Sequence, residues 1–409
     1  MAAVERRAVV VDERSRAARL AVSVLFFVNG AAAANWVPRI PDVKLALHLT
    51  DGALGLALLG TGLGALGGSL AAGMIDTRIG SRNLSTIAGV CLGLVLASPG
   101  LAPSWLALTV ALALLGFTDA VMDVAMNAHA VAVQQRYRRS IVNTFHALWS
   151  LGAMAGSLVG SLAAGRGVPV ATHLATAGVV LAVVVIVNRR SLLPTADVLV
   201  LRDGGAGAVG QRRTDRARRR GLVAPSGIVG ALGLITLLAA LIEDSPASWS
   251  AVYLRESLGA SAGVAGLAFA AFTGAMTVAR LLGDRAVEHF GAARVVRTGT
   301  LVSAVGLGGA LLLASPAAAI VGFGLVGIGV APVFPLTFAT AGSLPGIPPA
   351  GAIGMVSLLA RVGFLISPPV IGLIADAVGL PLALMFVVVA CVGVAGSAGI
   401  VTPRAERES

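Results

Sequence analysis

Three polar residues follow one another at four-residue intervals in one long apolar run: Asp119, Asp123 and Asn127. In a helix this spacing places all three side chains on one face. A charged residue near the middle of a membrane-spanning helix costs about 2.5–3.5 kcal/mol even on the lenient insertion scale, and such residues usually face an aqueous cavity. We therefore expect a protonatable stripe that lines a central cavity. The alternative is a ladder of hydrogen bonds that packs this helix against a neighbour.

Polar side chains also interrupt other apolar runs, and we expect them to reach the same cavity: Asn29, His146, Glu243, Asp244, Trp249 and Arg361. Glu243, Asp244 and Trp249 stand near the predicted end of their run, so a position at the membrane interface is the alternative for them. Arg361 stands mid-run, too far from either interface to snorkel, and needs an anionic partner from another helix or from a substrate. His146 can change its charge near neutral pH, although a lone histidine more often serves as a structural hydrogen-bonding group.

The composition excludes a soluble protein, because 57% of the 409 residues are hydrophobic, 12% are charged and the mean hydropathy is +0.91. An ordinary globular chain carries about a quarter charged residues. The formal net charge of +11 does not indicate nucleic-acid binding, since the basic residues are spread between apolar runs. Cys91 and Cys391 both lie inside such runs, so we expect no disulfide framework, no metal site and no cofactor.

Twelve apolar runs are long enough to cross a bilayer, which takes about 20 helical residues. They cover residues 18–38, 52–72, 84–102, 104–130, 140–164, 168–188, 225–247, 262–282, 296–314, 317–341, 350–374 and 380–401. The sequence thus predicts an all-α integral membrane protein with two pseudo-symmetric six-helix bundles, at 18–188 and 225–401. A tail (1–17) precedes them, a basic loop (189–224) joins them, and a second tail (402–409) follows.

The distribution of cations predicts the orientation in the membrane. With the N-terminus in the cytoplasm, only four of the 30 Lys and Arg residues fall in outside segments, namely Arg39, Lys44, Arg166 and Arg255, while Arg361 lies within a span. This is the segregation of the positive-inside rule. We expect a multi-pass protein of the cell membrane with both termini and the central loop in the cytoplasm, where the basic loops also attract anionic lipid.

The two halves repeat the same pattern. Segments 47–57 and 258–268 both read Leu-x4-Gly-x2-Gly-Leu-Ala, at an offset of 211 residues (from 47 to 258). Small residues at such places let helices approach closely in lipid. The pattern predicts a duplicated six-helix unit, an architecture in which the substrate site lies between the halves. The same offset relates two further glycine pairs, Gly80 with Gly291 and Gly152 with Gly363.

The loops after the second and eighth spans resemble the Gly-x3-Asp-Arg-x-Gly-Arg/Lys signature of the major facilitator superfamily (MFS). Their matching residues are Gly73, Asp76, Arg78, Gly80 and Arg82 in the first loop, and Gly283, Asp284, Arg285, Gly291 and Arg294 in the second. The first loop departs from the signature, because Thr77 takes the position of the acid and Asp76 stands one residue early. The resemblance implies the MFS fold, a cavity lined by spans one, four, seven and ten, and cytoplasmic gating loops that stabilise the outward-open state.

Segments 116–127, 145–152 and 243–254 resemble a narrower group, the fucose-permease-related branch, which contains proton-coupled sugar importers and many uncharacterised permeases. Fucose permease uses an acid on its first helix, where this chain offers only Asn29 and Asn35. This difference means that the sugar specificity does not carry over. From the resemblance we expect a proton-coupled permease, a symporter for a sugar or another small organic solute.

We expect secondary active transport by alternating access, performed by a monomer in the lipid bilayer. An exporter of drugs or secondary metabolites, acting as a proton antiporter, is the alternative. Glycines at 152, 156 and 160 approximate the antiporter signature, but Ser157 replaces its proline, and we interpret these glycines as helix packing. An intramembrane aspartyl enzyme is less consistent with the sequence, because Asp119 and Asp123 lie one turn apart on the same helix and do not meet across a scissile bond.

Overall fold

The computed structural model describes residues 12–137, 141–195, 227–344 and 347–401. All regular secondary structure within them is helical, and short turns join the helices. It has 12 helical spans long and apolar enough to cross a membrane. The prediction of an all-α membrane protein with twelve spans is confirmed. The predicted tails and central loop lie largely outside the described residues.

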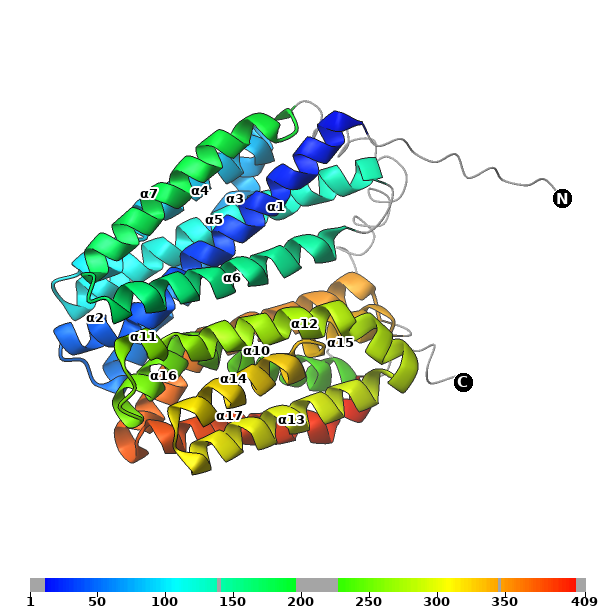
Figure 1. The fold of residues 1–409 in the computed structure, drawn as a ribbon. Coiled ribbons are helices and arrows are strands. Elements are labelled where there is room, and N and C mark those ends of the chain that lie inside the picture. Colours follow the sequence, from blue (N-terminus) through cyan, green and yellow to red (C-terminus); the bar gives the residue numbers. More distant parts are fainter. Residues whose placement is uncertain (1–11, 138–140, 196–226, 345–346, 402–409) are drawn as a thin grey trace.

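The helices form two bundles, drawn in blue to green and in green to red (Figure 1). The first bundle contains α1 (Glu13–Trp36), α2 (Ile40–Ala46), α3 (Asp51–Ile79), α4 (Ser81–Val95), α5 (Trp105–Tyr137), α6 (Val142–Gly165) and α7 (Val170–Asn188). The second contains α10 (Gly227–Val252), α11 (Ala262–Ala265), α12 (Leu267–Phe290), α13 (Ala292–Leu313), α14 (Pro316–Val330), α15 (Val333–Gly342), α16 (Pro349–Val378) and α17 (Leu380–Ser397).

Several spans are longer than the sequence predicted, and two of them continue through an irregular turn. The first continues from α1 through a 3-10 turn (Val37–Arg39) into α2, because Pro38 and Pro41 occupy the first positions of new helical segments, where the missing N–H breaks no hydrogen bond. The seventh, predicted to end at residue 247, continues from α10 through a π-helical turn (Tyr253–Ser257). Glu243 and Asp244 are therefore near the middle of the helical span Gly227–Ser257, which favours a position inside the membrane over an interfacial one.

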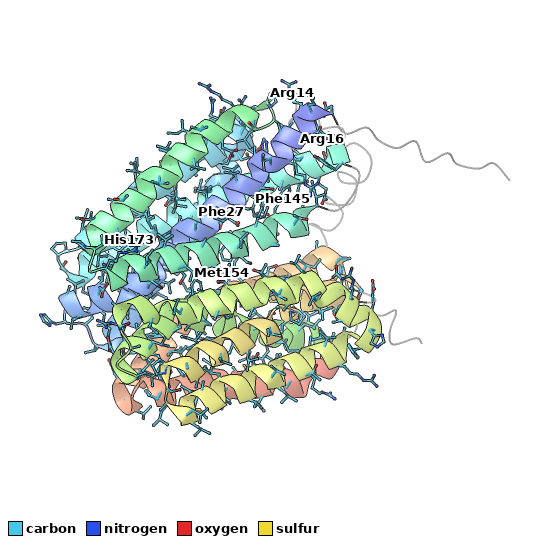
Figure 2. The ribbon with its side chains drawn as sticks, in the orientation of Figure 1. Arg14, Arg16, Phe27, Phe145, Met154 and His173 are labelled. Atoms are coloured by element: carbon cyan, nitrogen blue, oxygen red, sulfur yellow. The ribbon has the colours of Figure 1, made fainter. Side chains whose placement is uncertain are left out.

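Glycines bring α6 against α1, as the sequence predicted. A Cβ on Gly152 would lie 2.1 Å from the carbonyl oxygen of Phe27, and one on Gly156 would lie 2.4 Å from that of Ala31. Phe27 and Phe145 mark this pair of helices in Figure 2. The second bundle repeats the contact: a Cβ on Gly363 of α16 would lie 2.5 Å from the carbonyl oxygen of Leu237 on α10.

The predicted duplication also appears in the loops that follow α3 and α12. Gly80 has φ 78° and ψ 153°, and Gly291 has φ 80° and ψ 152°. Each glycine ends one helix and begins the next in a left-handed region that other residues rarely adopt. Two loops 211 residues apart thus share one backbone conformation that glycine alone adopts readily, which supports a common origin.

The two bundles touch at one end of the molecule. There a Cβ on Gly55 of α3 would lie 2.5 Å from the carbonyl oxygen of Pro368 on α16, and Gly165 of α6 lies against Gly263 of the second bundle. We call this end, with α2 and α11, the closed end. The bundle axes diverge toward the opposite end, where α1 begins and α12 finishes (Figure 1), and we call it the open end.

Candidate cavity between the two bundles

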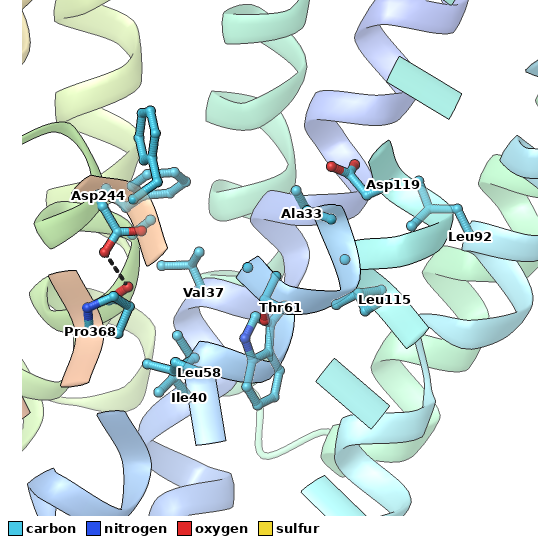
Figure 3. A pocket seen from close by; sticks show the side chains of 18 of the residues that line it. Ala33, Val37, Ile40, Leu58, Thr61, Leu92, Leu115, Asp119, Asp244 and Pro368 are labelled. Atoms are coloured by element: carbon cyan, nitrogen blue, oxygen red, sulfur yellow. Dashed lines mark hydrogen bonds between the residues drawn. The ribbon is translucent and has the colours of Figure 1, made fainter. Parts of the chain in front are cut away.

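A cavity of about 300 Å³ lies between the bundles near the middle of the spans. Both bundles line it, with Asp119 on α5 and Asp244 on α10 as its two carboxylates (Figure 3). The rest of the wall is mostly apolar and includes four aromatic side chains, those of Trp36, Trp149, Phe269 and Phe364. The structure thus brings together two of the acids that the sequence singled out, from helices far apart in the chain.

Asp119 is held by a chain of hydrogen bonds through three helices. Asn29 on α1 donates from Nδ2 to Asp119 Oδ1 across 2.8 Å, and its Oδ1 accepts from Trp149 Nε1 on α6 across 2.7 Å. An indole N–H only donates, so Trp149 sets the orientation of the Asn29 amide. The oxygen of Asp119 that faces Asn29 must therefore accept, which both a carboxylate and the carbonyl oxygen of a neutral acid can do.

Glu243 and Asp244 are neighbours in the chain but have different partners. Asp244 faces the cavity and accepts a hydrogen bond from Ser248 Oγ one turn further along, at 3.0 Å. Glu243 pairs with Arg280 of α12, with 3.2 Å between Oε1 and Nη2. Consecutive helical residues point about 100° apart, so a single helix sends one acid to the cavity and the other to the neighbouring helix.

Asp123, Asn127 and Arg361 were expected to line the cavity but are not among its lining residues; they lie beyond it, toward the open end. Asn127 Nδ2 donates to Asp123 Oδ1 across 2.9 Å, so the predicted one-face stripe on α5 is present. Arg361 on α16 is exposed and acts electrostatically on Asp123 across the bundles. No ion pair holds Arg361 among the described residues, contrary to the expected pairing. Its side chain reaches open space between the bundles and does not need a buried anion.

His146 and Trp249 complete the set of predicted cavity residues. His146 is exposed, packs edge-on against Phe26 with 5.2 Å between ring centroids, and interacts electrostatically with Arg280 of the other bundle. Its ring makes no hydrogen bond within the described chain, so the alternative of a structural hydrogen-bonding histidine is not supported. Trp249 is fully buried beside Gly372 and lies behind the cavity wall, because α10 turns this face toward α16.

A second polar cluster joins the bundles at the closed end. Lys44 of α2 donates to Asp51 Oδ1 at 2.7 Å and also forms an ion pair with Glu256 of the second bundle. Nearby, Thr50 Oγ1 donates to Asp376 Oδ2 of α16 across 2.9 Å. Of these five residues the sequence singled out only Lys44, as a cation on the outside, because the five stand far apart in the chain and nothing local indicates that they meet. Only the approach of the two bundles reveals the cluster.

Comparison with known proteins identifies the family. The model of the Major Facilitator Superfamily matches residues 22–198 and 232–409, which covers both bundles. The chain belongs to the major facilitator superfamily. An uncharacterised MFS-type transporter of Yersinia pestis is 33% identical over 94% of this chain and 96% of its own length. MFS proteins are transporters and not enzymes, so the intramembrane enzyme is excluded.

Solved structures of MFS proteins share the fold. The nucleoside transporter NupG superposes with a TM-score of 0.71 at 11% identity, covering 94% of this chain and 98% of its own. A bacterial homolog of the human lysosomal transporter Spinster reaches 0.73 at 14% identity, covering 95% and 97%. The MFS fold predicted from the repeat and the loop signature is therefore confirmed.

Proposed function

We propose that this MFS secondary transporter couples the movement of a small organic solute to protons, and that Asp119 carries the proton. One observation carries the proposal: Asp119 faces the cavity between the bundles, and its hydrogen-bond partner there is the neutral Asn29. A carboxylate without a cation in such a site is costly when charged, because few water molecules solvate it. Binding a proton removes that cost and makes the closed, water-poor states of the cycle accessible.

The closed end is proposed to face outside and the open end the cytoplasm. The distribution of Lys and Arg supports this orientation, with Lys44 and Arg255 at the closed end and Arg78, Arg82, Arg285 and Arg294 at the open end. The conformation is then inward-open. Transport requires the second conformation, in which contacts at the closed end separate and the open ends approach, so that Asp119 and the solute face the outside.

The gating loops 73–82 and 283–294 lie at the open end and are helical except at Gly80 and Gly291. They form the end of α3 with the start of α4, and the end of α12 with the start of α13. Asp76 is buried, whereas added Cβ atoms on Gly73 and Gly283 would meet nothing within 4 Å. We propose that these loops contact neighbouring helix ends when the open ends approach. In that role they stabilise the outward-open state.

Membership in the fucose-permease-related branch remains part of the proposal, supported by segments 116–127, 145–152 and 243–254. A second candidate is an exporter that exchanges an organic solute for protons. The apolar and aromatic wall of the cavity favours it over a sugar permease, because sugar hydroxyls that find no partner lose hydrogen bonds to water.

The test uses purified protein in liposomes that contain a pH-sensitive dye, screened with amines, sugars, amino acids and antibiotics. At least one solute should move protons across wild-type membranes. Asp119→Asn should abolish this movement, and Asp123→Asn should impair it, while both variants insert and fold normally. Glu13→Gln, which changes an exposed acid in the first turn of α1, is the matched control and should behave as wild type. Unchanged proton movement in both aspartate variants and in the double variant would exclude the proton-carrier role.

A further inference from the structure

We propose that the solute is an amphipathic organic cation, a protonated amine on an apolar or aromatic body, bound between Asp119 and Asp244. The inference rests on the proposed function and narrows its substrate class. It follows from three properties of the cavity: the charge of its lining, the chemistry of its walls, and the origin of its two acids in opposite bundles.

The charge of the lining is negative and uncompensated. Asp119 is hydrogen-bonded by the amide of Asn29, and Asp244 by the hydroxyl of Ser248, both neutral groups. Glu243, one residue away, shows the contrast, because it lies outside the cavity and is paired with Arg280. None of the described residues that line the cavity is Lys, Arg or His. A bound cation would supply the missing positive charge, whereas an anionic solute would meet two like charges at short range.

The walls fit an apolar body better than a sugar. Four aromatic side chains reach the cavity, from Trp36, Trp149, Phe269 and Phe364. An ammonium group within about 6 Å of such a ring gains a cation–π attraction, worth about 2 kcal/mol where water is excluded. Apart from the acids, the lining hydroxyls are only those of Thr61 and Ser248. A sugar carries more hydroxyl groups than this wall can pair, and each unpaired group lowers affinity.

The size of the cavity limits the solute. At about 300 Å³ it stands at the lower end of small-molecule sites. An amine with a single ring or a short apolar chain suits this volume better than a large multi-ring compound. The ligand class is therefore a small, amphipathic monoamine.

The two acids come from different bundles, Asp119 from the first and Asp244 from the second. An ammonium group in the cavity is attracted by both acids, and both distances shorten when the bundles approach around the solute, so binding favours the occluded conformation. Protons compete for the same carboxylates, because an acid that has taken up a proton no longer offers a negative charge. Binding of the amine is therefore expected to weaken as the pH falls, and its transport to proceed in exchange for protons.

The test compares ligands that differ in charge but share one body: 2-phenylethylamine, 2-phenylethanol and 3-phenylpropionate, with cyclohexylmethylamine and cyclohexylmethanol as a second pair. Binding is measured on detergent-solubilised full-length protein by calorimetry and thermal shift, at pH 7.5 and pH 5.5. We expect at least one amine to bind tenfold more tightly than its neutral alcohol, with the advantage reduced at pH 5.5. Asp119→Asn and Asp244→Asn should each weaken that binding at least tenfold, and Glu13→Gln should not.

Thermal unfolding of each variant verifies that it is folded, and the near-isosteric Asp→Asn changes add no bulk. Two outcomes overturn the inference: a panel in which no amine binds more tightly than its alcohol, or amine binding that survives both aspartate variants. The liposome assay separates this failure from failure of the proposed function. If a neutral or anionic solute moves protons through Asp119, the proposed function holds and the cationic substrate class is excluded. If an amine binds through both aspartates but no protons move, the cationic substrate class holds and proton coupling is excluded.

Discussion

Asn29 of α1 donates a hydrogen bond to Asp119 of α5 across 2.8 Å, at the level of the cavity between the bundles. The contact joins two helices that are 90 residues apart in sequence. Because Trp149 fixes the other end of the same amide, the acid has a donor already oriented toward it. Movement of α1 relative to α6 therefore changes the surroundings of Asp119 directly.

Replacing Asn29 with leucine should break the series of hydrogen bonds from Trp149 through Asn29 to Asp119. Asn29→Leu leaves the indole N–H of Trp149 and one oxygen of Asp119 without their partner, and a lost buried hydrogen bond of this kind costs about 1–3 kcal/mol. We expect a lower temperature of unfolding and at least a tenfold loss of transport. Trp149→Phe is the matched control, since it removes one donor but leaves the Asn29–Asp119 contact, and should have the smaller effect. Equal effects of the two variants would contradict the greater importance of the Asn29–Asp119 hydrogen bond over that from Trp149 to Asn29.

Weakening the closed end should shift the conformational population. Lys44 is 7% exposed and its partner Glu256 42% exposed, so their ion pair is partly screened and worth about 1 kcal/mol. A two-state carrier balanced within a few kcal/mol responds to such a change. Glu256→Gln combined with Thr50→Val should therefore raise the fraction of molecules that are open at this end severalfold.

Cysteine labelling measures this shift. A cysteine is placed at Val37, a cavity-lining position, after Cys91 and Cys391 have been replaced. Labelling by a membrane-impermeant reagent added outside should be severalfold faster in the Glu256→Gln, Thr50→Val background than in the parent. Glu13→Gln at the open end serves as the control and should not alter it. Unchanged labelling would show that these contacts do not hold the closed end together.

The loops at the open end should have the opposite effect. A variant that lacks the side chains of Asp76, Arg78 and Asp284 is expected to populate the inward-open state more, because the proposed role of these loops is to stabilise the outward-open state. Each contact contributes about 0–1 kcal/mol alone, so the three changes are combined. Labelling from outside at the Val37 cysteine should fall while folding is preserved. If it stays constant or rises, the loops are ordinary solvated turns whose basic residues determine topology alone.

Arg361→Ala should lower transport without lowering stability. The side chain is exposed between the bundles and makes no ion pair among the described residues, so its loss leaves no buried anion without a partner. Its electrostatic attraction to Asp123 acts across the bundles and is expected to strengthen when the open ends approach. We expect an unchanged unfolding temperature and a reduced transport rate, with Arg361→Lys partly restoring the rate. A marked loss of thermal stability would show that Arg361 has a buried partner.

Sequence alone determined the number of spans, the helical class, the duplication and the family. These properties are local or periodic: a span needs only length and hydropathy, and the stripe of Asp119, Asp123 and Asn127 needs only the helical repeat. That the glycines of α6 serve helix packing was also predictable, since small residues four apart let helices approach closely in lipid, but that the partner is α1 came from the structure.

Tertiary structure decided which polar groups meet. Nothing local distinguishes Asp244, which lines the same cavity as Asp119, from Glu243, which turns to Arg280. The choice depends on the rotation of α10 about its axis, and packing against α12 and α16 sets that rotation. The bridge of Lys44 to Glu256 likewise depends on which ends of the bundles are in contact. That conformation reflects a balance of many weak contacts between the bundles, which no single segment of the chain contains.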